Sequence, residues 1–164
     1  MEVYFCCFSK ADLMEYQNAL SSLPDIPPET EWTAKGAEAY RQGDYSTAVR
    51  YYKRAAARGD SVALSNLGYC YYYGRSVAQD KEKARQCWEQ AAAYGDVAAI
   101  YKLGDMHQNG DTERNSDAAW TFYRAAYRLS NSAKDSETYP DVCLRYLRYG
   151  EGRLSRRELA HLAG

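Results

Sequence analysis

The sequence predicts an all-α protein, a right-handed solenoid of antiparallel helix pairs, and three observations predict it. Glycines recur at a spacing of 36 residues in the pairs Gly59/Gly95, Gly68/Gly104 and Gly74/Gly110. A fixed period between about 20 and 50 residues is typical of stacked helical arrays. Alanine-rich segments with helical spacing recur alongside the glycines. The composition favours helices over strands, because 24 Ala and 17 Tyr stand beside only eight Val and Ile.

The second helix of each pair is predicted by an alanine, an aromatic residue four positions later and an alanine seven positions later. Such positions share one helical face, where the small residues admit a neighbouring helix and the aromatic ring fills the gap. The triples are Ala48/Tyr52/Ala55, Ala84/Trp88/Ala91 and Ala118/Phe122/Ala125. We therefore expect helix pairs at about 29–58, 61–94 and 97–129, then a pair from about 138 that ends early.

The first helices are predicted at residues 62–73 and 98–109, each with a glycine near its middle, Gly68 or Gly104. A mid-helix glycine costs about 1 kcal/mol relative to alanine, so its recurrence indicates close contact with the paired helix. Between pairs stands Gly-Asp, as in Gly59-Asp60, where the glycine ends one helix and the aspartate caps the next.

The second pair resembles the Sel1-like repeat, a branch of the tetratricopeptide superfamily. The residues that carry the resemblance are Gly68, Gly74, Val77, Asp80, Ala84, Trp88, Ala91, Ala92 and Gly95. Ser76 departs from the pattern, because the family usually has a second glycine there. The first pair, with Trp32, Gly36 and Tyr40, is closer to a tetratricopeptide repeat proper, and the third has lost the valine and aspartate of the loop. The resemblance covers roughly residues 30–154 and implies the solenoid fold.

Five segments follow from this reading. Residues 1–28 are expected to be a capping segment with one helix that begins after Ser9, and residues 3–8 are either a short strand or coil. The repeats are a tetratricopeptide-like repeat at 29–60, a Sel1-like repeat at 61–96, a degenerate repeat at 97–133 and a partial repeat at 134–164. The last segment is expected to include a short capping helix, which a capping box from Ser155 to Glu158 opens.

Composition excludes several classes of protein. The net charge of −1 argues against a general binder of nucleic acid or of anionic membranes. The longest apolar run, residues 3–8, is far shorter than the roughly 20 residues of a membrane helix, so no membrane association is expected. The chain has five cysteines, an odd number, and an acidic residue stands where a secretory signal would be basic. Both features favour a reduced, cytoplasmic protein.

The chain carries no catalytic signature, and we expect neither enzymatic activity nor a cofactor or metal. It has two histidines, and among its polar residues only Asp105, His107 and Glu113 form a plausible cluster for acid–base chemistry. Cys70 and Cys87 are interpreted as small apolar side chains packed between helices, with a disulfide or metal site as the alternative. Cys6 and Cys7 have no partner pair at zinc-ligand spacing.

The predicted function is a non-catalytic adaptor, scaffold or inhibitor that holds a protein segment in the concave groove of the array. Tyrosines favour binding because they present apolar area with a polar tip. The expected partner is a segment of hydrophobic and acidic character, since tyrosines give way to arginines along the groove. The alternatives are a regulatory subunit of an enzyme and a weak nucleic-acid binder that uses the C-terminal arginines. The groove residues are predicted to be Tyr40, Arg41, Tyr69, Tyr72, Tyr73, Tyr101, Asp105, Gln108, Asn109, Arg145, Arg148 and Tyr149.

Overall fold

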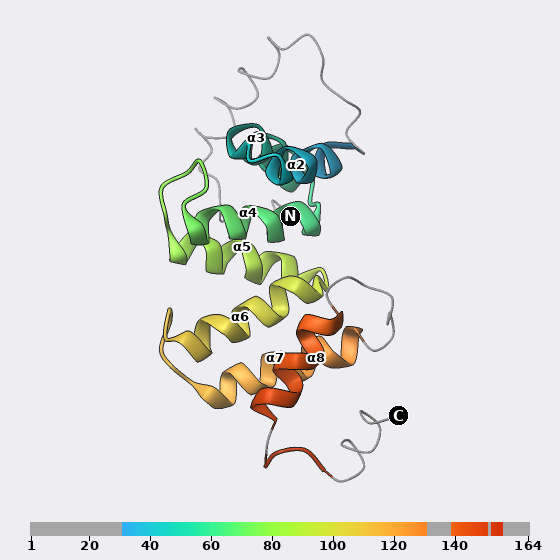
Figure 1. The fold of residues 1–164 in the computed structure, drawn as a ribbon, viewed down its shortest axis with the longest axis vertical. Helices are drawn as coiled ribbons and strands as arrows, with labels where there is room; N and C mark the ends of the chain where they lie inside the picture. The colour runs from blue at the N-terminus through green and yellow to red at the C-terminus, as the bar shows by residue number, and fades with distance from the viewer. Residues whose placement is uncertain (1–30, 131–138, 151, 156–164) are drawn as a thin grey trace, which may run out of the picture. The chain divides into compact units, whose positions relative to one another are not determined.

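The computed structural model describes residues 31–130, 139–150 and 152–155, and these residues form seven helices and no strand (Figure 1). The predicted all-α fold is confirmed over this part of the chain. The expected capping segment at 1–28, the helix expected after Ser155, and Cys6 and Cys7 lie outside the described residues. The chain divides into two compact units, residues 1–96 (unit 1) and 97–164 (unit 2).

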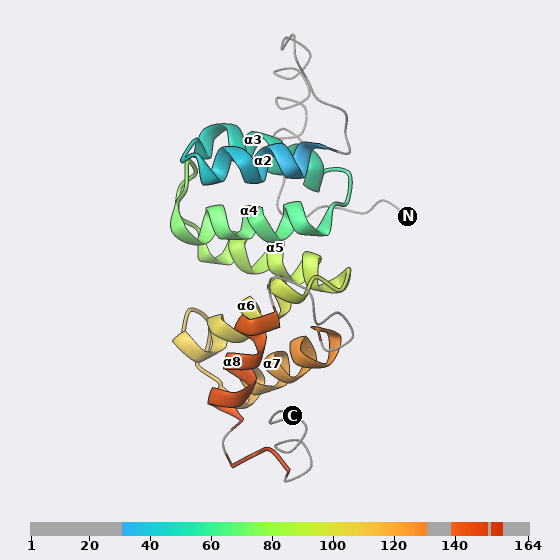
Figure 2. The same cartoon turned by 45° about the vertical axis from the view of Figure 1, so that its right-hand side comes forward.

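Unit 1 contains α2 (Trp32–Arg41), α3 (Tyr45–Ala56), α4 (Ser61–Tyr73) and α5 (Lys81–Ala93). Each of these helices packs on the next in chain order, and Figure 2 shows α2 and α3 overlapping at one level, with α4 and then α5 below them. Tight turns reverse the chain between α2 and α3 and between α3 and α4. In the first turn the Asp44 amide donates to the Ala39 carbonyl at 2.9 Å, and in the second the Asp60 amide donates to the Ala55 carbonyl at 3.2 Å.

Aspartates begin three of these helices, as the sequence predicts for Asp60. The side chains of Asp44, Asp60 and Asp80 each accept a hydrogen bond from the backbone amide three residues later. Such a cap satisfies one of the amides that the first helical turn leaves unpaired. Gly59, just before Asp60, has a φ of +85°, which is the left-handed conformation expected at the end of the preceding helix.

Unit 2 contains α6 (Val97–Asn109), α7 (Ser116–Ser130) and α8 (Tyr139–Tyr149). In this unit α6 packs on α7, and α7 packs on α8. The contact between α7 and α8 is aromatic, because the Tyr146 ring stacks on Trp120 and Tyr127 at centroid distances of 4.9 and 4.2 Å. No helix in the described ranges is both long and apolar enough to cross a bilayer.

The mid-helix glycines lie where paired helices approach, as predicted. A Cβ added at Gly68 would lie 2.5 Å from the Trp88 indole nitrogen, and one added at Gly104 would lie 2.7 Å from the Tyr123 ring. The same indole nitrogen donates a hydrogen bond to the Ser65 carbonyl at 3.0 Å. Glycine therefore admits an aromatic side chain of the second helix against the backbone of the first.

The predicted register of the third repeat is wrong by one residue. The buried face of α7 carries Ala119, Tyr123 and Ala126, whereas the predicted Phe122 is half-buried and Ala125 is exposed. The reason lies in the loop before α7. The Asn115 side chain caps this helix by accepting from the Ala118 amide at 2.9 Å, so the loop is one residue shorter than its counterpart before α5.

Cys143 and Leu144 of α8 do not contribute to the buried core. Cys143 is half-buried and Leu144 is 65% exposed. The buried face of α8 is formed instead by Val142 and Tyr146, which pack against α7.

Candidate functional site

A hollow of about 180 Å³ opens in unit 1 between three helices. Tyr40 of α2, Tyr52 of α3, and Asn66 and Tyr69 of α4 line it. Tyr40 and Tyr69 were predicted to line a groove, and the structure places both at this hollow. Tyr52 and Asn66 were not predicted as site residues. The wall is therefore largely aromatic, with a carboxamide among the rings.

The polar groups of the hollow have unused hydrogen-bonding capacity. Within the described residues, neither the Asn66 carboxamide nor the Tyr52 hydroxyl has a hydrogen-bond partner, although Tyr52 is only 2% exposed. Burial raises the pKa of both Tyr40 and Tyr52, so both hydroxyls remain protonated at neutral pH. The hollow thus offers hydrogen-bond donors and acceptors inside an apolar wall.

Three tyrosines continue the aromatic surface along α4. The Tyr69 and Tyr73 rings stack at 5.7 Å between centroids, and the Tyr72 and Tyr73 rings meet edge to face at 4.9 Å. The Trp88 ring supports Tyr72 at 5.5 Å, while the outermost ring, Tyr73, is 51% exposed. These contacts hold the rings in place, which reduces the entropy that a bound partner would cost. We call Tyr40, Tyr69, Tyr72 and Tyr73 the tyrosine surface.

Cationic side chains border the tyrosine surface. The Arg75 guanidinium lies 4.9 Å from the centroid of the Tyr45 ring, which in turn meets the Tyr40 ring at 5.0 Å. The Lys81 ammonium lies 5.5 Å from the Tyr72 ring. The predicted Arg41 is exposed and forms an ion pair of 2.7 Å with Glu38, one helical turn earlier.

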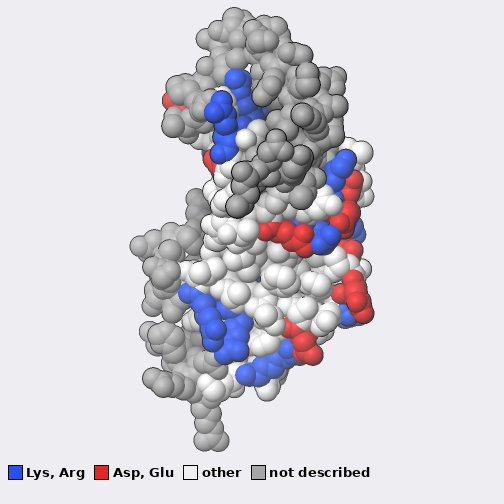
Figure 3. All heavy atoms as spheres, turned by 180° about the vertical axis from the view of Figure 1, so that it is seen from behind, with Lys and Arg blue, Asp and Glu red and all other residues white. Residues whose placement is uncertain are grey.

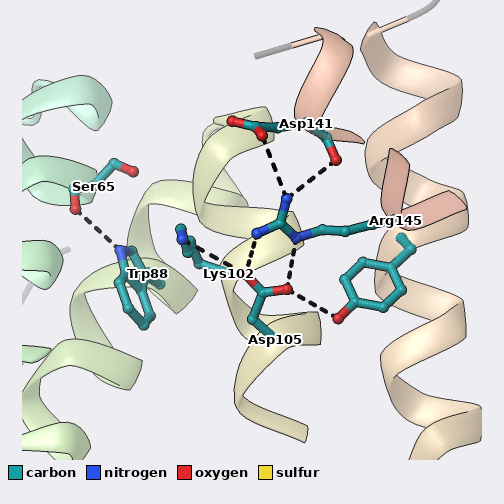
Figure 4. Close-up of polar contacts among 7 residues, drawn as sticks. Ser65, Trp88, Lys102, Asp105, Asp141 and Arg145 are labelled. Atoms are coloured by element: carbon teal, nitrogen blue, oxygen red, sulfur yellow. Dashed lines mark hydrogen bonds and ion pairs between the residues drawn. The ribbon is translucent and has the colours of Figure 1, made fainter. Parts of the chain in front are cut away.

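In unit 2, three predicted groove residues hold one another, and Figure 4 shows two of them, Asp105 and Arg145. Arg145 of α8 donates from Nε and Nη2 to the two carboxylate oxygens of Asp105 at 2.7 and 2.8 Å. Its guanidinium also lies 4.5 Å from the centroid of the Tyr101 ring, which is only 5% exposed. The Tyr123 hydroxyl donates to Asp105 as well, at 3.0 Å. This arrangement joins α6, α7 and α8 and leaves little of Tyr101 for a partner.

The other predicted residues of unit 2 lie closer to the surface. Asn109 and Arg148 are exposed, and Gln108 and Tyr149 are half-buried. The Tyr149 ring stacks on Tyr123 at 5.2 Å, and the Arg148 guanidinium lies 5.7 Å from the Tyr149 ring.

The polar cluster considered for acid–base chemistry does not assemble. The His107 ring nitrogen Nδ1 lies 3.2 Å from the backbone carbonyl of Glu113, not from its carboxylate, and the ring stacks on Phe122. The Asp105 carboxylate is held by Arg145 instead. These contacts give His107 a structural role in the loop between α6 and α7.

The cysteines of the described residues are free thiols. Cys70 and Cys87 are buried, in agreement with the predicted packing role, and burial raises the pKa of Cys70 to about 12. Within the described residues, histidine, cysteine and carboxylate side chains form no group that could hold a metal ion. On the face in Figure 3, the described Lys and Arg residues lie in small groups, with acidic side chains near some of them.

Comparison with known proteins agrees with this architecture. The Sel1 repeat model matches residues 32–60, 61–96 and 97–131. The chitin synthase regulator SKT5 of Saccharomyces cerevisiae is 34% identical over 122 residues, which cover 69% of this chain and 17% of SKT5. HRD3B of Arabidopsis thaliana, an ERAD-associated E3 ubiquitin-protein ligase component, is 33% identical over 58 residues, 35% of this chain and 10% of HRD3B. This chain thus spans only a small part of the length of these relatives.

Two solved structures share the fold. A protective antigen of uropathogenic Escherichia coli that displays an SLR fold matches with a TM-score of 0.64 and 23% identity, over 94% of this chain and 32% of the antigen. A Sel1 repeat protein from Oxalobacter formigenes matches with a TM-score of 0.53 and 25% identity, over 79% of this chain and 95% of that protein. Because the three matched segments contain the pairs α2–α3, α4–α5 and α6–α7, the chain belongs to the Sel1 repeat family.

Proposed function

We propose that this chain is a non-catalytic interaction module that binds a protein segment on the tyrosine surface of unit 1. The observation that carries the proposal is the hollow beside that surface, which combines aromatic walls with the Asn66 carboxamide, for which the described residues provide no hydrogen-bond partner. Aromatic rings provide the apolar contact area that dominates binding energy at protein interfaces. The aromatic surface is already assembled in the unbound chain.

The chemistry of the hollow suits a protein main chain. A peptide group carries one donor and one acceptor. A carboxamide and a hydroxyl can satisfy both, since each donates and accepts. We therefore expect a peptide group of the partner to meet Asn66 and Tyr52, while a neighbouring apolar side chain contacts Tyr40 and Tyr69.

The bordering cations favour a partner segment that carries negative charge. Arg75 and Lys81 lie next to aromatic rings at the edge of the tyrosine surface. An acidic residue beside the apolar anchor would form charge-assisted hydrogen bonds with them. The proposed partner is accordingly a segment of hydrophobic and acidic character.

The relatives favour an enzyme or an enzyme complex as the source of that segment. One relative is named as a regulator of chitin synthase and another as a component of a ubiquitin ligase. Regulation of an enzyme by direct binding is consistent with the non-catalytic interaction module proposed for this chain.

A peptide display library, selected on the purified chain, tests this proposal. We expect enrichment of peptides that place an aromatic or aliphatic residue near Asp or Glu. Binding of a selected peptide is then measured by fluorescence anisotropy to wild type, Tyr73→Ala and Asn66→Ala. Each substitution should weaken binding by about fivefold or more, because a lost anchor typically costs at least about 1 kcal/mol.

Tyr94→Ala is the matched control, since Tyr94 is 58% exposed and follows the end of α5, at the other end of the α4–α5 pair. This variant should bind the peptide as wild type does. All variants are checked for an unchanged melting temperature. Full affinity in both Tyr73→Ala and Asn66→Ala would show that the peptide does not bind on the tyrosine surface.

A further inference from the structure

Helix α8 exposes two leucines next to the side that packs against α7. Leu144 is 65% exposed and Leu147 is 43% exposed. They lie three residues apart, so they are neighbours on the helix surface. Val142 and Tyr146 occupy the buried side of the same helix. The two leucines thus form an apolar patch on the surface of unit 2.

The neighbours of Tyr146 show which side of unit 2 this patch borders. The Tyr146 ring packs against α7 between Trp120 and Tyr127. Arg145, the residue before it, reaches α6 through its hydrogen bonds. Successive residues of a helix are turned by about 100°. Leu147, the residue after Tyr146, therefore points away from α6.

Two arginines of α7 lie on that same side. The Tyr123 ring packs against Gly104 of α6, which defines the side of α7 that faces α6. Helical spacing places Arg124 and Arg128 on the other side of the rings that hold Tyr146. Both arginines are exposed. They share this side of unit 2 with the leucine patch.

Contacts along the two helices place Arg124 level with the leucines. The Tyr149 ring stacks on Tyr123 at 5.2 Å, and farther along the chain Arg153 forms an ion pair of 2.7 Å with Asp117. Residue numbers thus rise along α8 as they fall along α7. Arg124, one residue after Tyr123, accordingly lies near the level of the residues just before Tyr149. We call Leu144, Leu147, Arg124 and Arg128 the leucine–arginine face.

The acidic side chains of α7 and α8 are engaged with other arginines. Each helix contains a single acidic residue, Asp117 in α7 and Asp141 in α8. Asp117 forms the ion pair with Arg153, and the Asp141 carboxylate lies 3.7 Å from the Arg145 guanidinium. The arginines of the leucine–arginine face are paired with neither carboxylate.

Three exposed arginines beside the leucines keep their charge unneutralised. Arg124 and Arg128 border the leucines on the α7 side, and Arg148, one turn after Leu144, borders them on the opposite side. Within the ranges that the structure describes, none of the three forms an ion pair or a hydrogen bond. An apolar strip between such cations is complementary to an amphipathic helix whose apolar face lies between acidic side chains.

A second copy of the chain fits this face less well. In a two-fold symmetric dimer the same surface patch meets itself, so arginines would approach arginines. Like charges brought together at an interface oppose binding. The charge of the face therefore favours a different protein as the occupant.

We propose that the leucine–arginine face binds an acidic amphipathic helix of another protein. The apolar side of that helix covers Leu144 and Leu147, and its flanking Asp or Glu residues pair with Arg124 and Arg128 on one side and with Arg148 on the other. This site lies on unit 2 and uses none of the residues of the tyrosine surface.

Two fluorescein-labelled peptides test the proposal on the full chain by fluorescence anisotropy. Both are helices of about 16 residues with the same stripe of leucines, flanked by Glu in one peptide and by Lys in the other. We expect the Glu peptide to bind wild type at least about tenfold more tightly than the Lys peptide. Arg124→Glu combined with Arg128→Glu should reverse this order. Leu147→Ala should weaken binding of the Glu peptide by about fivefold or more.

Arg50→Glu combined with Arg114→Glu is the matched control, because both arginines are exposed and neither belongs to the face. This variant has the same change in net charge and should keep the wild-type preference for the Glu peptide. Every variant is checked for an unchanged melting temperature. Equal binding of the two peptides to wild type, or an unreversed order in the Arg124→Glu, Arg128→Glu variant, would overturn the proposal.

Two further outcomes distinguish other occupants and other sites. If Tyr73→Ala weakens binding of the Glu peptide and Leu147→Ala does not, the peptide binds on the tyrosine surface, which supports the proposed function and overturns this inference. A wild-type dimer in sedimentation velocity that Leu147→Asp dissociates would assign the face to a second copy and overturn it as well. Failure of the proposed function would leave this test intact, because the two surfaces lie on different helices.

Discussion

Arg145 and Asp105 lie 40 residues apart in the sequence and join through two parallel hydrogen bonds of 2.7 and 2.8 Å. The pair links α6 to α8, and neither side chain is more than about a quarter exposed. Removing one partner of such a pair destabilises the fold by more than the intact pair stabilises it, because the remaining charge has lost its counter-charge. The pair therefore fixes α8 against the rest of unit 2.

Asp105→Asn should destabilise unit 2 by about 1–3 kcal/mol, since the amide cannot accept both hydrogen bonds from Arg145. Urea unfolding followed by circular dichroism measures the loss. Asp141→Asn is the matched control on the same arginine, because Asp141 is 59% exposed and its carboxylate lies 3.7 Å from Arg145. The control should lose little stability, as exposed ion pairs usually do. Equal losses in both variants would contradict the role assigned to Asp105.

Gly68→Leu should destabilise unit 1 by about 1–3 kcal/mol or more, because overpacking displaces neighbours from their preferred positions. Even the Cβ of Gly68→Ala would lie 2.5 Å from the Trp88 indole nitrogen and would disturb its hydrogen bond to Ser65. Thermal melts measure both effects. Ala93→Leu adds a similar volume at an exposed position of α5 and should leave the midpoint nearly unchanged. An unchanged midpoint for Gly68→Leu would mean that the helices do not meet there.

The helix pairs could be predicted because their signals are local. Glycines, aspartate caps and alanine–aromatic spacing each act within a few residues of the chain. The register of α7 could not be predicted from spacing alone. Each member of the triple stands in a doublet, Ala118-Ala119, Phe122-Tyr123 and Ala125-Ala126, so two helical faces one residue apart fit equally well. Recognising Asn115 as the helix cap would have decided between them.

The site was only partly predictable. The positions of Tyr40 and Tyr69 could be predicted from the helical face on which each lies. The pairing of Arg145 with Asp105 could not, because it depends on how two helices far apart in the sequence pack. A single asparagine such as Asn66 forms no sequence motif that would mark it as a site residue. Counting back from Tyr73 and Tyr69 along one face of α4 would have identified it, because positions 66, 69 and 73 have the spacing i, i+3 and i+7.

Ser76→Gly should stabilise the chain. Ser76 has a φ of 57°, a left-handed conformation that costs a residue with a Cβ about 1–2 kcal/mol. Glycine removes this cost, although its greater freedom in the unfolded chain offsets part of the gain, by about 0.4–1 kcal/mol. We expect a melting temperature about 1–4 °C higher, measured by calorimetry. Ser46→Gly, within the first turn of α3, should lower it. A lower midpoint for Ser76→Gly would show that the serine is not strained.

Alkaline pH should unfold the chain through its buried hydroxyl and thiol groups. Burial raises the pKa of Tyr52 above its ordinary value of 10.0 and that of Cys70 from 9.0 to about 12. In both cases the fold disfavours the ionised form, so the stabilisation is complete below the unfolded pKa and is lost as the pH rises above it. The urea midpoint should therefore stay constant between about pH 7 and 8 and fall above about pH 9.

Tyr52→Phe isolates one source of this pH dependence. The substitution keeps the ring that packs against Gly36 and removes the hydroxyl that ionises. Its urea midpoint should fall less steeply above about pH 10 than that of wild type, because the unfolded chain gains one fewer ionisation. Tyr94→Phe, which alters an exposed ring, is the matched control and should follow the wild-type profile. If the Tyr52→Phe profile is as steep as that of wild type, the ionisation of Tyr52 does not contribute to the alkaline loss, and Cys70 and Tyr123 become the groups to replace next.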